Sequence, residues 1–455
     1  MNYNSLHIGN IANIAYATCK ILDKYQHPVE LICHDENHLM SQPEWNDLEL
    51  DPEDFPNENN FFSNTSKMMD YKLPFWFKRS KMFSENHSII RKIASYLPLS
   101  VKSFIKPMYS KIVNPVHLKK TIDFKYPYDD NHKLYLEKVY NEAKIWGIKK
   151  EDLDVYLPHA YWLNKQIKEK DLCFAYAASP IYCLLGSHKP YIATEIGTLR
   201  DIPPESGVTG KILALSYQRA NFVIVTNPDA REQMNKLGIK KYRFCPHPVD
   251  EDVYKPLDRK ELNYIKEELL EGHKADLLIM APARQNWKLK GNDKYLKAIK
   301  KLKDQGIIIR LVVPLWGQDI DNTKKLVKSL GIESQVKWIK PLSEPLLIKY
   351  LTVVDAVIDQ LELGVFGFVT AKALACELPV LTSYDKDLHH WCFDEHPPIL
   401  NCNSTEELTE NLKNLIDAPY RKKIGVASRN WFLKYHSSSV VHKILNETAE
   451  EIIRK

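Results

Sequence analysis

Residues 277–291 read LLIMAPARQNWKLKG, and this stretch decides the fold. Its apolar run at 277–280 predicts a short buried strand, and the basic loop after that run leads into an amphipathic pattern at 292–303 that predicts a helix. A second helix is expected at 322–330, and further strands are expected at 307–309, 312–313, 336–339, 353–354, 356–358 and 379–381. Short strands that alternate with helices are typical of a parallel sheet covered on both faces. We therefore predict a doubly wound α/β lobe over about 277–420.

The first 255 residues predict a second unit of the same class. A strand at 5–8, a helix with Asn10 as its N-cap, and a strand at 29–33 make a βαβ opening with Gly9 at its turn. Later strands are expected at 174–177, 191–194 and 222–225. A chain of 455 residues exceeds what one core usually organises, so two lobes are expected. We place their boundaries at 1–255 and 256–430, with a last helix at 431–455 that returns to the first lobe.

The composition is that of an ordinary globular protein. Hydrophobic residues make up 44% and charged residues 27%, and the formal net charge of +5 does not by itself indicate a nucleic-acid partner. The eight cysteines form no C-x-x-C pair and no cluster at metal-ligand spacing, so we expect reduced thiols and no metal site. We expect neither a cleaved signal nor a membrane-spanning segment, because no run reaches about 18 apolar residues. The expected compartment is the cytoplasm, with the inner membrane face as a peripheral contact.

An insertion at about 55–130 has a different character. It begins acidic and rich in Asn, and residues 66–125 then carry 13 Lys/Arg against 3 Asp/Glu. Segments 73–79 and 97–113 interleave apolar and basic residues, as helices do when they lie on anionic lipid. Two interpretations stay open: a basic insertion packed on the first lobe, or contact with an anionic membrane surface or a lipid acceptor. Nucleic acid is not expected as a partner, because no RNA- or DNA-binding motif is present.

The loop after the strand at 277–280 carries residues suited to phosphate binding. Arg284 offers a planar, bidentate fork and Lys290 a compact charge, and Gly291 permits close backbone approach at the positive end of the next helix. Ligands of doubly wound sheets bind beyond the carboxyl ends of the strands, which is where this loop is expected. A basic loop can also be a solvated turn, and its position after a strand is what favours binding.

A second candidate site is expected at 359–376. Gly364 and Gly367 belong to a tight turn before an Ala-rich helix, whose free backbone N–H groups could face a ligand. Taken alone, such a turn is also a common packing device. Its occurrence on the same lobe as Arg284 favours a shared ligand site.

The order of these motifs resembles that of the GT-B glycosyltransferases, specifically the group called family 4, which are typically retaining enzymes. The likeness rests on five segments: Gly9-Asn10-Ile11-Ala12-Asn13, Glu195-Ile196-Gly197-Thr198-Leu199-Arg200-Asp201, His247-Pro248-Val249-Asp250, Ala283-Arg284 to Lys290-Gly291, and Phe366-Gly367-Phe368 to Ala375-Cys376. In the family these are an N-terminal loop facing the cleft, an acceptor-side loop, the hinge between the lobes, the donor-phosphate motif, and the loop and helix that receive nucleoside and sugar. The resemblance implies two Rossmann-like lobes that face a central cleft.

The resemblance also assigns roles to individual residues. Contacts to the donor, a nucleotide-diphosphate sugar, are implied for Arg284, Lys290, Gly291, Phe366 and Gly367. Contacts on the acceptor side are implied for Gly9, Asn10, Asn13, Thr198 and Arg200, and the catalytic candidates are Glu195 and Asp201. Each polar residue of these acceptor-side loops can alternatively cap or stabilise its own turn.

The chain departs from the family where donor sugar and ribose are held. Members carry a pair of glutamates there, and the matching positions are Gly364 and Lys372. Glu377 and Ile196 stand where glycine and histidine are common. Glu362 could supply a displaced carboxylate to the donor, and Lys372 could contact a phosphate or an acidic sugar. A surface glutamate and a solvated lysine are the alternatives.

These features favour a retaining glycosyltransferase of polysaccharide biosynthesis, with a glycan or glycolipid as acceptor. Arg284 and Lys290 would neutralise the departing nucleotide diphosphate as negative charge grows on it, so no metal and no cofactor are expected. Two alternatives stay open. One is a non-catalytic binding or regulatory protein that has lost its sugar-handling carboxylates. The other is a different enzyme with the same fold, such as an epimerase or a phosphorylase.

Overall fold

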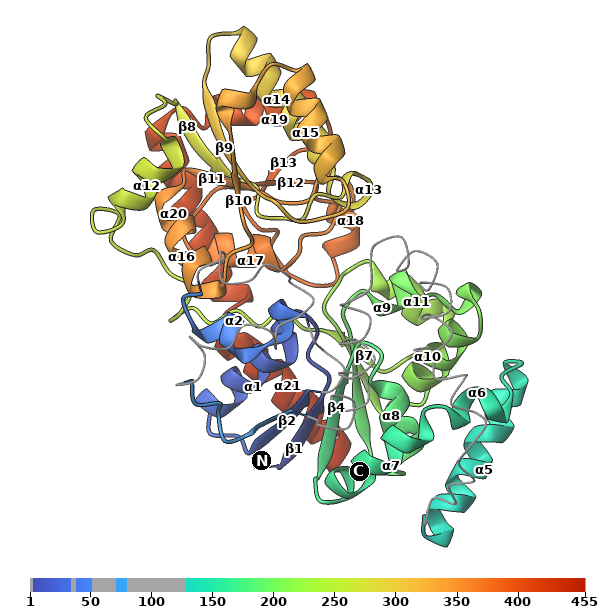
Figure 1. The fold of residues 1–455 in the computed structure, drawn as a ribbon. Coiled ribbons are helices and arrows are strands. Elements are labelled where there is room, and N and C mark those ends of the chain that lie inside the picture. Colours follow the sequence, from blue (N-terminus) through green and yellow to red (C-terminus); the bar gives the residue numbers. More distant parts are fainter. Residues whose placement is uncertain (1–2, 34–37, 51–70, 80–127, 455) are drawn as a thin grey trace, which may run out of the picture.

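The structure is a computed structural model that describes residues 3–33, 38–50, 71–79 and 128–454. Its strands form two sheets, and the strand pairings in both sheets are parallel (Figure 1). The first sheet has seven strands in the order β3-β2-β1-β4-β5-β6-β7, and the second has six in the order β10-β9-β8-β11-β12-β13. Two doubly wound parallel sheets confirm the prediction of two Rossmann-like lobes.

The first lobe folds around β1, which lies between β2 and β4 and is buried throughout. Its strands are β1 (Ser5–Ile8), β2 (Val29–Cys33), β3 (Phe77–Arg79), β4 (Leu172–Tyr176), β5 (Tyr191–Glu195), β6 (Phe222–Val225) and β7 (Tyr242–Phe244). One core contains side chains of α1 (Ile14–Lys24) and α21 (Ser438–Ile453), and the cores on the other side contain those of α7 (Leu157–Lys168), α8 (Pro180–Gly186) and α10 (Val208–Gln218). Because side chains alternate along a strand, Phe174 and Ala175 of β4 enter different cores.

The second lobe repeats this plan around β8. Its strands are β8 (Leu277–Met280), β9 (Ile309–Pro314), β10 (Val336–Ile339), β11 (Ala356–Ile358), β12 (Val380–Thr382) and β13 (Leu400–Asn401). Leu278 and Met280 enter a core with α16 (Glu344–Val353), α17 (Phe368–Ala375) and α20 (Ala418–Tyr435). Leu277 and Ile279 enter a core with α14 (Asn292–Asp304), α15 (Ile320–Ser329) and α19 (Thr405–Asn414). The sheet therefore carries helices on both faces, as the apolar pattern predicts.

The prediction of a strand at 353–354 is wrong, because helix α16 runs to Val353 and the chain turns there into β11. The expected strands at 307–309 and 312–313 are replaced by the single strand β9. Helices α5 (Asp130–Ile145) and α6 (Lys150–Asp154) lie at the outer edge of the first lobe (Figure 1).

The segment at 73–79 belongs to the sheet and not to an interfacial helix. Its last three residues are the edge strand β3 beside β2, and Trp76 and Phe77 are buried. Lys78 Nζ lies 2.8 Å from a Glu30 carboxylate oxygen, so this basic side chain is already paired. Most of the predicted basic stretch at 66–125, including 97–113, lies outside the described residues.

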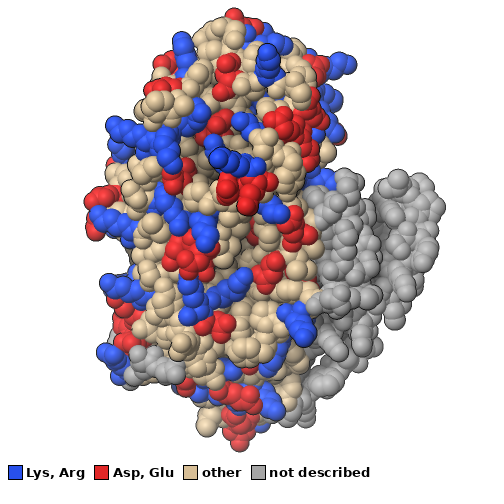
Figure 2. Space-filling view, turned by 90° about the vertical axis from the view of Figure 1, so that its left-hand side faces the viewer, with Lys and Arg blue, Asp and Glu red and all other residues tan. Residues whose placement is uncertain are grey.

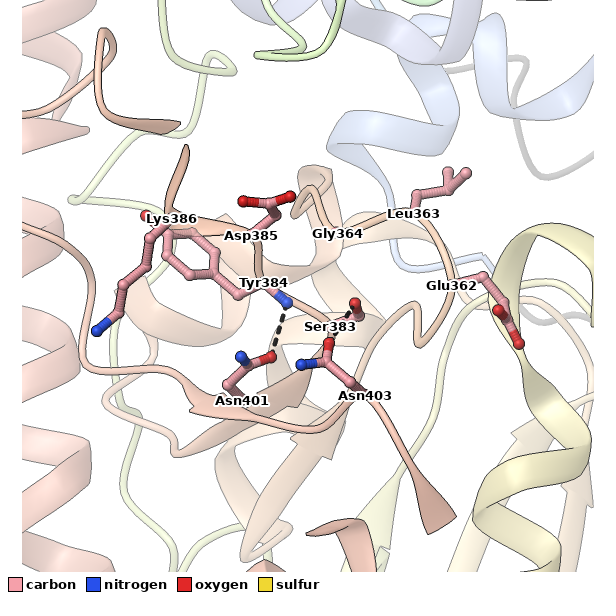
Figure 3. A pocket seen from close by; sticks show the side chains of 9 residues that line it. All are labelled: Glu362, Leu363, Gly364, Ser383, Tyr384, Asp385, Lys386, Asn401 and Asn403. Atoms are coloured by element: carbon pink, nitrogen blue, oxygen red, sulfur yellow. Dashed lines mark hydrogen bonds between the residues drawn. The ribbon is translucent and has the colours of Figure 1, made fainter. Parts of the chain in front are cut away.

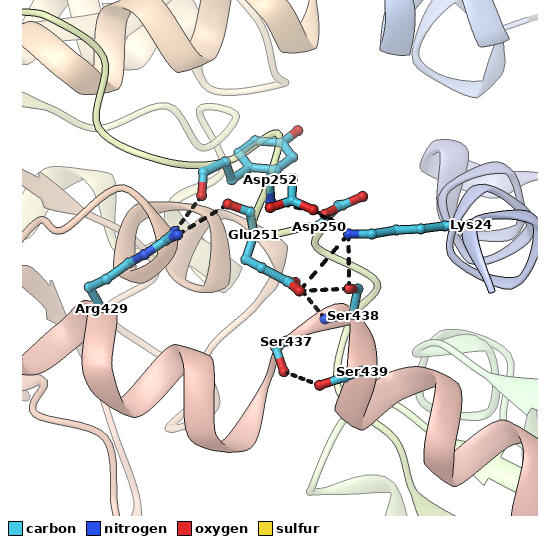
Figure 4. A network of polar contacts seen from close by, with 9 residues as sticks. Lys24, Asp250, Glu251, Asp252, Arg429, Ser437, Ser438 and Ser439 are labelled. Carbon is cyan, nitrogen blue, oxygen red and sulfur yellow. Dashed lines mark hydrogen bonds and ion pairs between the residues drawn. The ribbon is translucent and has the colours of Figure 1, made fainter.

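Two segments of chain connect the lobes, and a polar network joins them (Figure 4). Lys24 Nζ of α1 lies 2.8 Å from Asp250 Oδ1 and 2.7 Å from Asp252 Oδ2 in the first connection. At the second connection, between α20 and α21, Ser438 Oγ donates to Glu251 Oε1 at 2.8 Å. Helix α21 then packs against α1 in the first lobe. Both connections are thus fixed to one another and to the first lobe.

The surface in Figure 2 carries Lys and Arg side chains interspersed with Asp and Glu side chains. On that face the charges of the two signs alternate over short distances, and such an arrangement does not favour a large polyanion. In the part of the chain that the structure describes, no helix has the length and apolar character that crossing a membrane requires.

Candidate functional site

Loops from the carboxyl ends of both sheets meet between the lobes. His38 follows β2 and Trp316 follows β9, and their rings lie 6.2 Å apart. Pro228 follows β6, and its carbonyl oxygen accepts from Trp391 Nε1 of the second lobe at 3.3 Å. Because ligands of parallel sheets bind beyond the carboxyl ends of the strands, this interface is where a site is expected.

The loop after β8 is held by its own side chains. Asn286 caps the short helix α13 (Trp287–Lys290) by accepting from Leu289 N at 3.1 Å, and Asn292 Oδ1 accepts from Asn286 N at 2.7 Å. Gly291 has a φ of 63°, and a Cβ at this position would lie 3.0 Å from Leu361 Cβ. Glycine therefore allows this loop to approach the loop after β11, so the two motifs predicted from the sequence lie side by side.

Arg284 and Lys290 project from this loop into different environments. Arg284 is exposed, and its guanidinium makes no hydrogen bond or ion pair with any residue that the structure describes. Lys290 is partly buried and donates to Gln360 Oε1 at 2.6 Å. Burial lowers the pKa of Lys290, the positive charges of Arg284 and Arg200 lower it further, and the carboxylate of Asp359 opposes the shift. A bound dianion would relieve this crowding of cations.

The loop after β11 is built largely from buried groups. Asp359 accepts from Thr370 Oγ1 at 2.7 Å, and Gly367 is the N-cap of α17. Phe366 is 3% exposed, and its ring stacks on that of His389 with centroids 5.3 Å apart. The ring of Phe366 is therefore part of the core, and a contact between this residue and the donor stays a prediction.

An open pocket of about 550 Å³ lies beside this loop (Figure 3). It is lined by Glu362, Leu363, Gly364, Ser383, Tyr384, Asp385, Lys386, Asn401 and Asn403. Lys294 of α14 holds one carboxylate oxygen of Glu362 at 2.9 Å. Gly364 has a φ of 67°, and a Cβ there would lie 3.1 Å from Asp385 Cβ. The structure therefore brings Glu362 and Gly364 to one pocket, whose lining does not include Arg284 or Lys290.

Lys372 is held inside the second lobe by an ion pair. Its ammonium lies 2.6 and 2.7 Å from the two carboxylate oxygens of Glu344, and 4.1 Å from the centroid of the Phe368 ring. Tyr254 also donates a hydrogen bond to Glu344. The side chain of Lys372 is 7% exposed. The charge of Lys372 is therefore paired with Glu344 in this structure, and its contact with the donor stays a prediction.

The acidic residue that begins the loop at 195–201 points inward. Glu195 is fully buried and accepts from Gly197 N at 2.5 Å and from Leu199 N at 2.8 Å. Burial raises the pKa of Glu195, although these two hydrogen bonds oppose the shift. Thr198 begins the short helix α9 (Thr198–Asp201), and Asp201 ends it with an exposed side chain. Glu195 therefore shapes the loop, and of the two catalytic candidates only Asp201 is exposed.

The remaining acceptor-side candidates divide into two groups. Gly9 has a φ of 88°, and a Cβ there would lie 2.4 Å from a serine hydroxyl oxygen, so this residue serves the turn. Asn10 and Asn13 are buried, and their Nδ2 atoms donate to backbone oxygens of the turn at 41–42 at 2.8 and 2.7 Å. Arg200 is different, because its side chain is partly exposed and its positive charge lowers the pKa of Lys290 in the second lobe.

Sequence reasoning missed the partners of these groups. Gln360 follows β11 directly, and a polar residue at the carboxyl end of a strand was the signal that could have found it. Glu344 and Asp229, the partners of Lys372 and Arg200, come from distant segments and leave no local signal. Over residues 3–33, 38–50, 71–79 and 128–454, no group of three or more His, Cys, Asp and Glu side chains could hold a metal ion.

Comparisons with known proteins agree with this architecture. Residues 264–431 match the family model described as Glycosyl transferases group 1. No curated relative matches the sequence. A glycosyltransferase from Rickettsia africae ESF-5 aligns with a TM-score of 0.60 and 13% identity over 100% of this chain and 99% of that chain.

Two further solved structures have the same fold. Sucrose-phosphate synthase from Thermosynechococcus elongatus aligns with a TM-score of 0.60 and 13% identity over 99% of both chains. Anabaena HepE, in complex with UDP and glucose, aligns with a TM-score of 0.54 and 15% identity over 64% of this chain and 80% of that chain. These likenesses confirm the predicted GT-B arrangement of two lobes.

Proposed function

We propose that the protein transfers a sugar from a nucleotide-diphosphate sugar to an acceptor, because residues 264–431 match the family model of glycosyl transferases group 1 and the chain has the fold of solved glycosyltransferases. The observation that carries the proposal is the pair of cations after β8. Arg284 is exposed and has no side-chain partner among the described residues, and the pKa of Lys290 is already lowered by burial and by neighbouring cations, Arg284 among them. Such a pair favours a ligand that brings two negative charges.

These cations would act on the leaving group. When the bond between the sugar and the diphosphate breaks, negative charge grows on the diphosphate and positive charge on the sugar ring. Arg284 and Lys290 would stabilise the growing negative charge without reorganising, because the loop is already fixed by Asn286 and Asn292. HepE, which shares the fold, was solved with UDP and glucose, and this supports the same class of donor here.

We further propose that the reaction retains the anomeric configuration and needs no metal ion. The resemblance to family 4 supports retention, and the two cations supply the positive charge that a metal would otherwise supply at the diphosphate. The proposed acceptor is a glycan or a glycolipid that enters from the side of the first lobe, where Asp201 is exposed.

A binding screen tests the proposal. UDP-, GDP- and ADP-glucose are each added to the protein, and the melting temperature is followed, because a ligand of the folded state raises it. For the nucleotide sugar that binds, Arg284→Ala is expected to weaken affinity by about 1.5–3 kcal/mol through loss of a charged hydrogen bond. Arg219→Ala is the control, since Arg219 pairs with Glu142 at 3.3 Å within the first lobe. Equal affinities of the folded Arg284→Ala variant and wild type would contradict the proposal.

A second candidate function is a non-catalytic nucleotide-sugar-binding protein. It is favoured by Gly364 and Lys372, which stand where the resembled family has carboxylates, and by the ion pair that occupies Lys372. Release of the nucleoside diphosphate from the bound donor distinguishes the two functions. Binding without release, in the presence of a range of glycan acceptors, would support the non-catalytic protein.

A further inference from the structure

Arg200 lies on the first lobe at the point where that lobe touches the second. Helices α9 and α11 (Ala230–Lys236) lie on the side of the first lobe that faces α18 (Lys386–His389) of the second (Figure 1). Two contacts fix this juxtaposition: Pro228 O accepts from Trp391 Nε1 at 3.3 Å, and Arg231 Nη1 lies 3.0 Å from His390 Nε2. Asp229 lies between these two contacts in the sequence and therefore sits at the interface.

The guanidinium of Arg200 is anchored at one end only. Its Nη2 atom donates to Asp229 Oδ1 at 2.5 Å. Its Nε atom is buried and has no hydrogen-bond partner among the described residues. The side chain as a whole remains 32% exposed. One carboxylate thus orients the guanidinium, which leaves N–H donors for a ligand.

The charges around Arg200 favour an anion. Arg200, Arg284 and Lys290 lie close enough together for both arginines to lower the pKa of Lys290, whose largest perturbation is burial. Three carboxylates lie near these three cations. Asp229 is paired with Arg200, Asp359 is buried and accepts from Thr370, and the buried Glu195 beside Arg200 accepts from two backbone N–H groups of its own loop. Arg284 has no carboxylate partner in the described part of the chain, so its guanidinium is available to bind an anion.

We propose that Arg200 binds the diphosphate of the donor from the first lobe, opposite Arg284 and Lys290, so that one anion is held by both lobes. This inference rests on the proposed function and assigns Arg200 to the donor rather than to the acceptor. A diphosphate has oxygens on two phosphorus atoms, and an arginine fork can bind one phosphate group while Arg284 and Lys290 bind the other. Donor binding would then stabilise contact between the lobes.

Arg200→Gln removes the charge and keeps much of the side-chain length. The probes are UDP, GDP and ADP with their nucleosides, and inorganic pyrophosphate, measured by isothermal titration calorimetry. For the nucleotide that binds wild type, and for pyrophosphate, Arg200→Gln is expected to lower affinity at least tenfold and to leave nucleoside affinity within twofold. Arg200→Lys should recover part of the loss. Arg219→Gln, which removes an arginine from a first-lobe ion pair, should bind diphosphates like wild type.

The outcomes separate this inference from the proposed function. If Arg284→Gln loses diphosphate affinity while folded Arg200→Gln keeps it, the role of Arg200 is refuted and the proposed function stands. If Arg200→Gln raises only the KM of the acceptor, Arg200 is an acceptor residue and the inference is likewise overturned. If neither variant differs from wild type for any diphosphate, the proposed function itself fails.

Discussion

Replacing Lys372 with methionine tests the packing of the second lobe most directly. Methionine keeps the length of the side chain and removes its charge, so Glu344 loses the ammonium that lies 2.6 and 2.7 Å from its oxygens. The contact with the Phe368 ring would lose its cation as well. The variant therefore measures what the ion pair contributes to the free energy of unfolding.

The expected loss follows from the burial of the pair. Removing one partner of a buried ion pair costs about 3–5 kcal/mol, because the other charge is left unpaired. The side chains of Lys372 and Glu344 are 7% and 17% exposed, and Glu344 keeps its hydrogen bond from Tyr254. These two features of Glu344 place the expected loss near the lower limit, about 3 kcal/mol. Replacing both partners, in Lys372→Met with Glu344→Leu, removes the unpaired charge and should recover most of the loss.

Urea unfolding followed by tryptophan fluorescence measures both variants, and the double-mutant cycle gives the coupling energy between the two positions. The single variant should unfold at lower urea than wild type, and the double variant close to wild type. Unchanged stability of Lys372→Met would refute the reasoning, because the ammonium would then not be held by Glu344. It would instead be free for a ligand, as the sequence suggests.

Two further predictions concern the backbone and pH. Gly9→Ala should lower the free energy of unfolding by about 3 kcal/mol, because its positive φ is strained for alanine and a Cβ would lie 2.4 Å from a serine hydroxyl. The control is Gly272→Ala, at a φ of 75° with open space around it. This variant should lose only about 1 kcal/mol in the same urea assay. Burial lowers the pKa of His159 and of His247 to about 4. Below about pH 6.5 the two imidazoles bind protons in the unfolded chain but not in the folded chain. The free energy of unfolding should therefore fall as the pH drops from 7 to 5, by on the order of 2 kcal/mol per histidine. Urea midpoints that are equal at both pH values would contradict this.

Much of the architecture could be predicted because its signals are local. The strands β8, β10 and β11 and the helix α14 match short apolar runs and an amphipathic period in the sequence. The prediction failed at 353–354, because a short apolar run at the end of a buried helix looks the same as a strand. The edge strand β3 could not be predicted, since it lies inside the predicted insertion and depends on pairing with β2 from before the insertion.

Some residues of the candidate site could likewise be located from local sequence signals, and others could not. The position of Arg284, Lys290 and Gly291 in the loop after β8 could be predicted, because the carboxyl end of a parallel strand is a position that sequence can locate; their contact with a donor stays a prediction. Phe366 and Lys372 were assigned to the donor on their place in a motif. The structure places one in an aromatic core with His389 and pairs the other with Glu344.

The amino-acid sequence by itself determined two α/β lobes and a basic loop suited to a diphosphate, because strand periodicity and loop charge depend on residues that are neighbours in the sequence. Only the tertiary structure decided which cations are available to a ligand. A charged side chain is neutralised by an opposite charge within a few ångströms, and that partner comes from a distant part of the chain. Glu344 forms an ion pair with Lys372, and Asp229 forms one with Arg200 at the interface. Arg284 has no partner among the described residues.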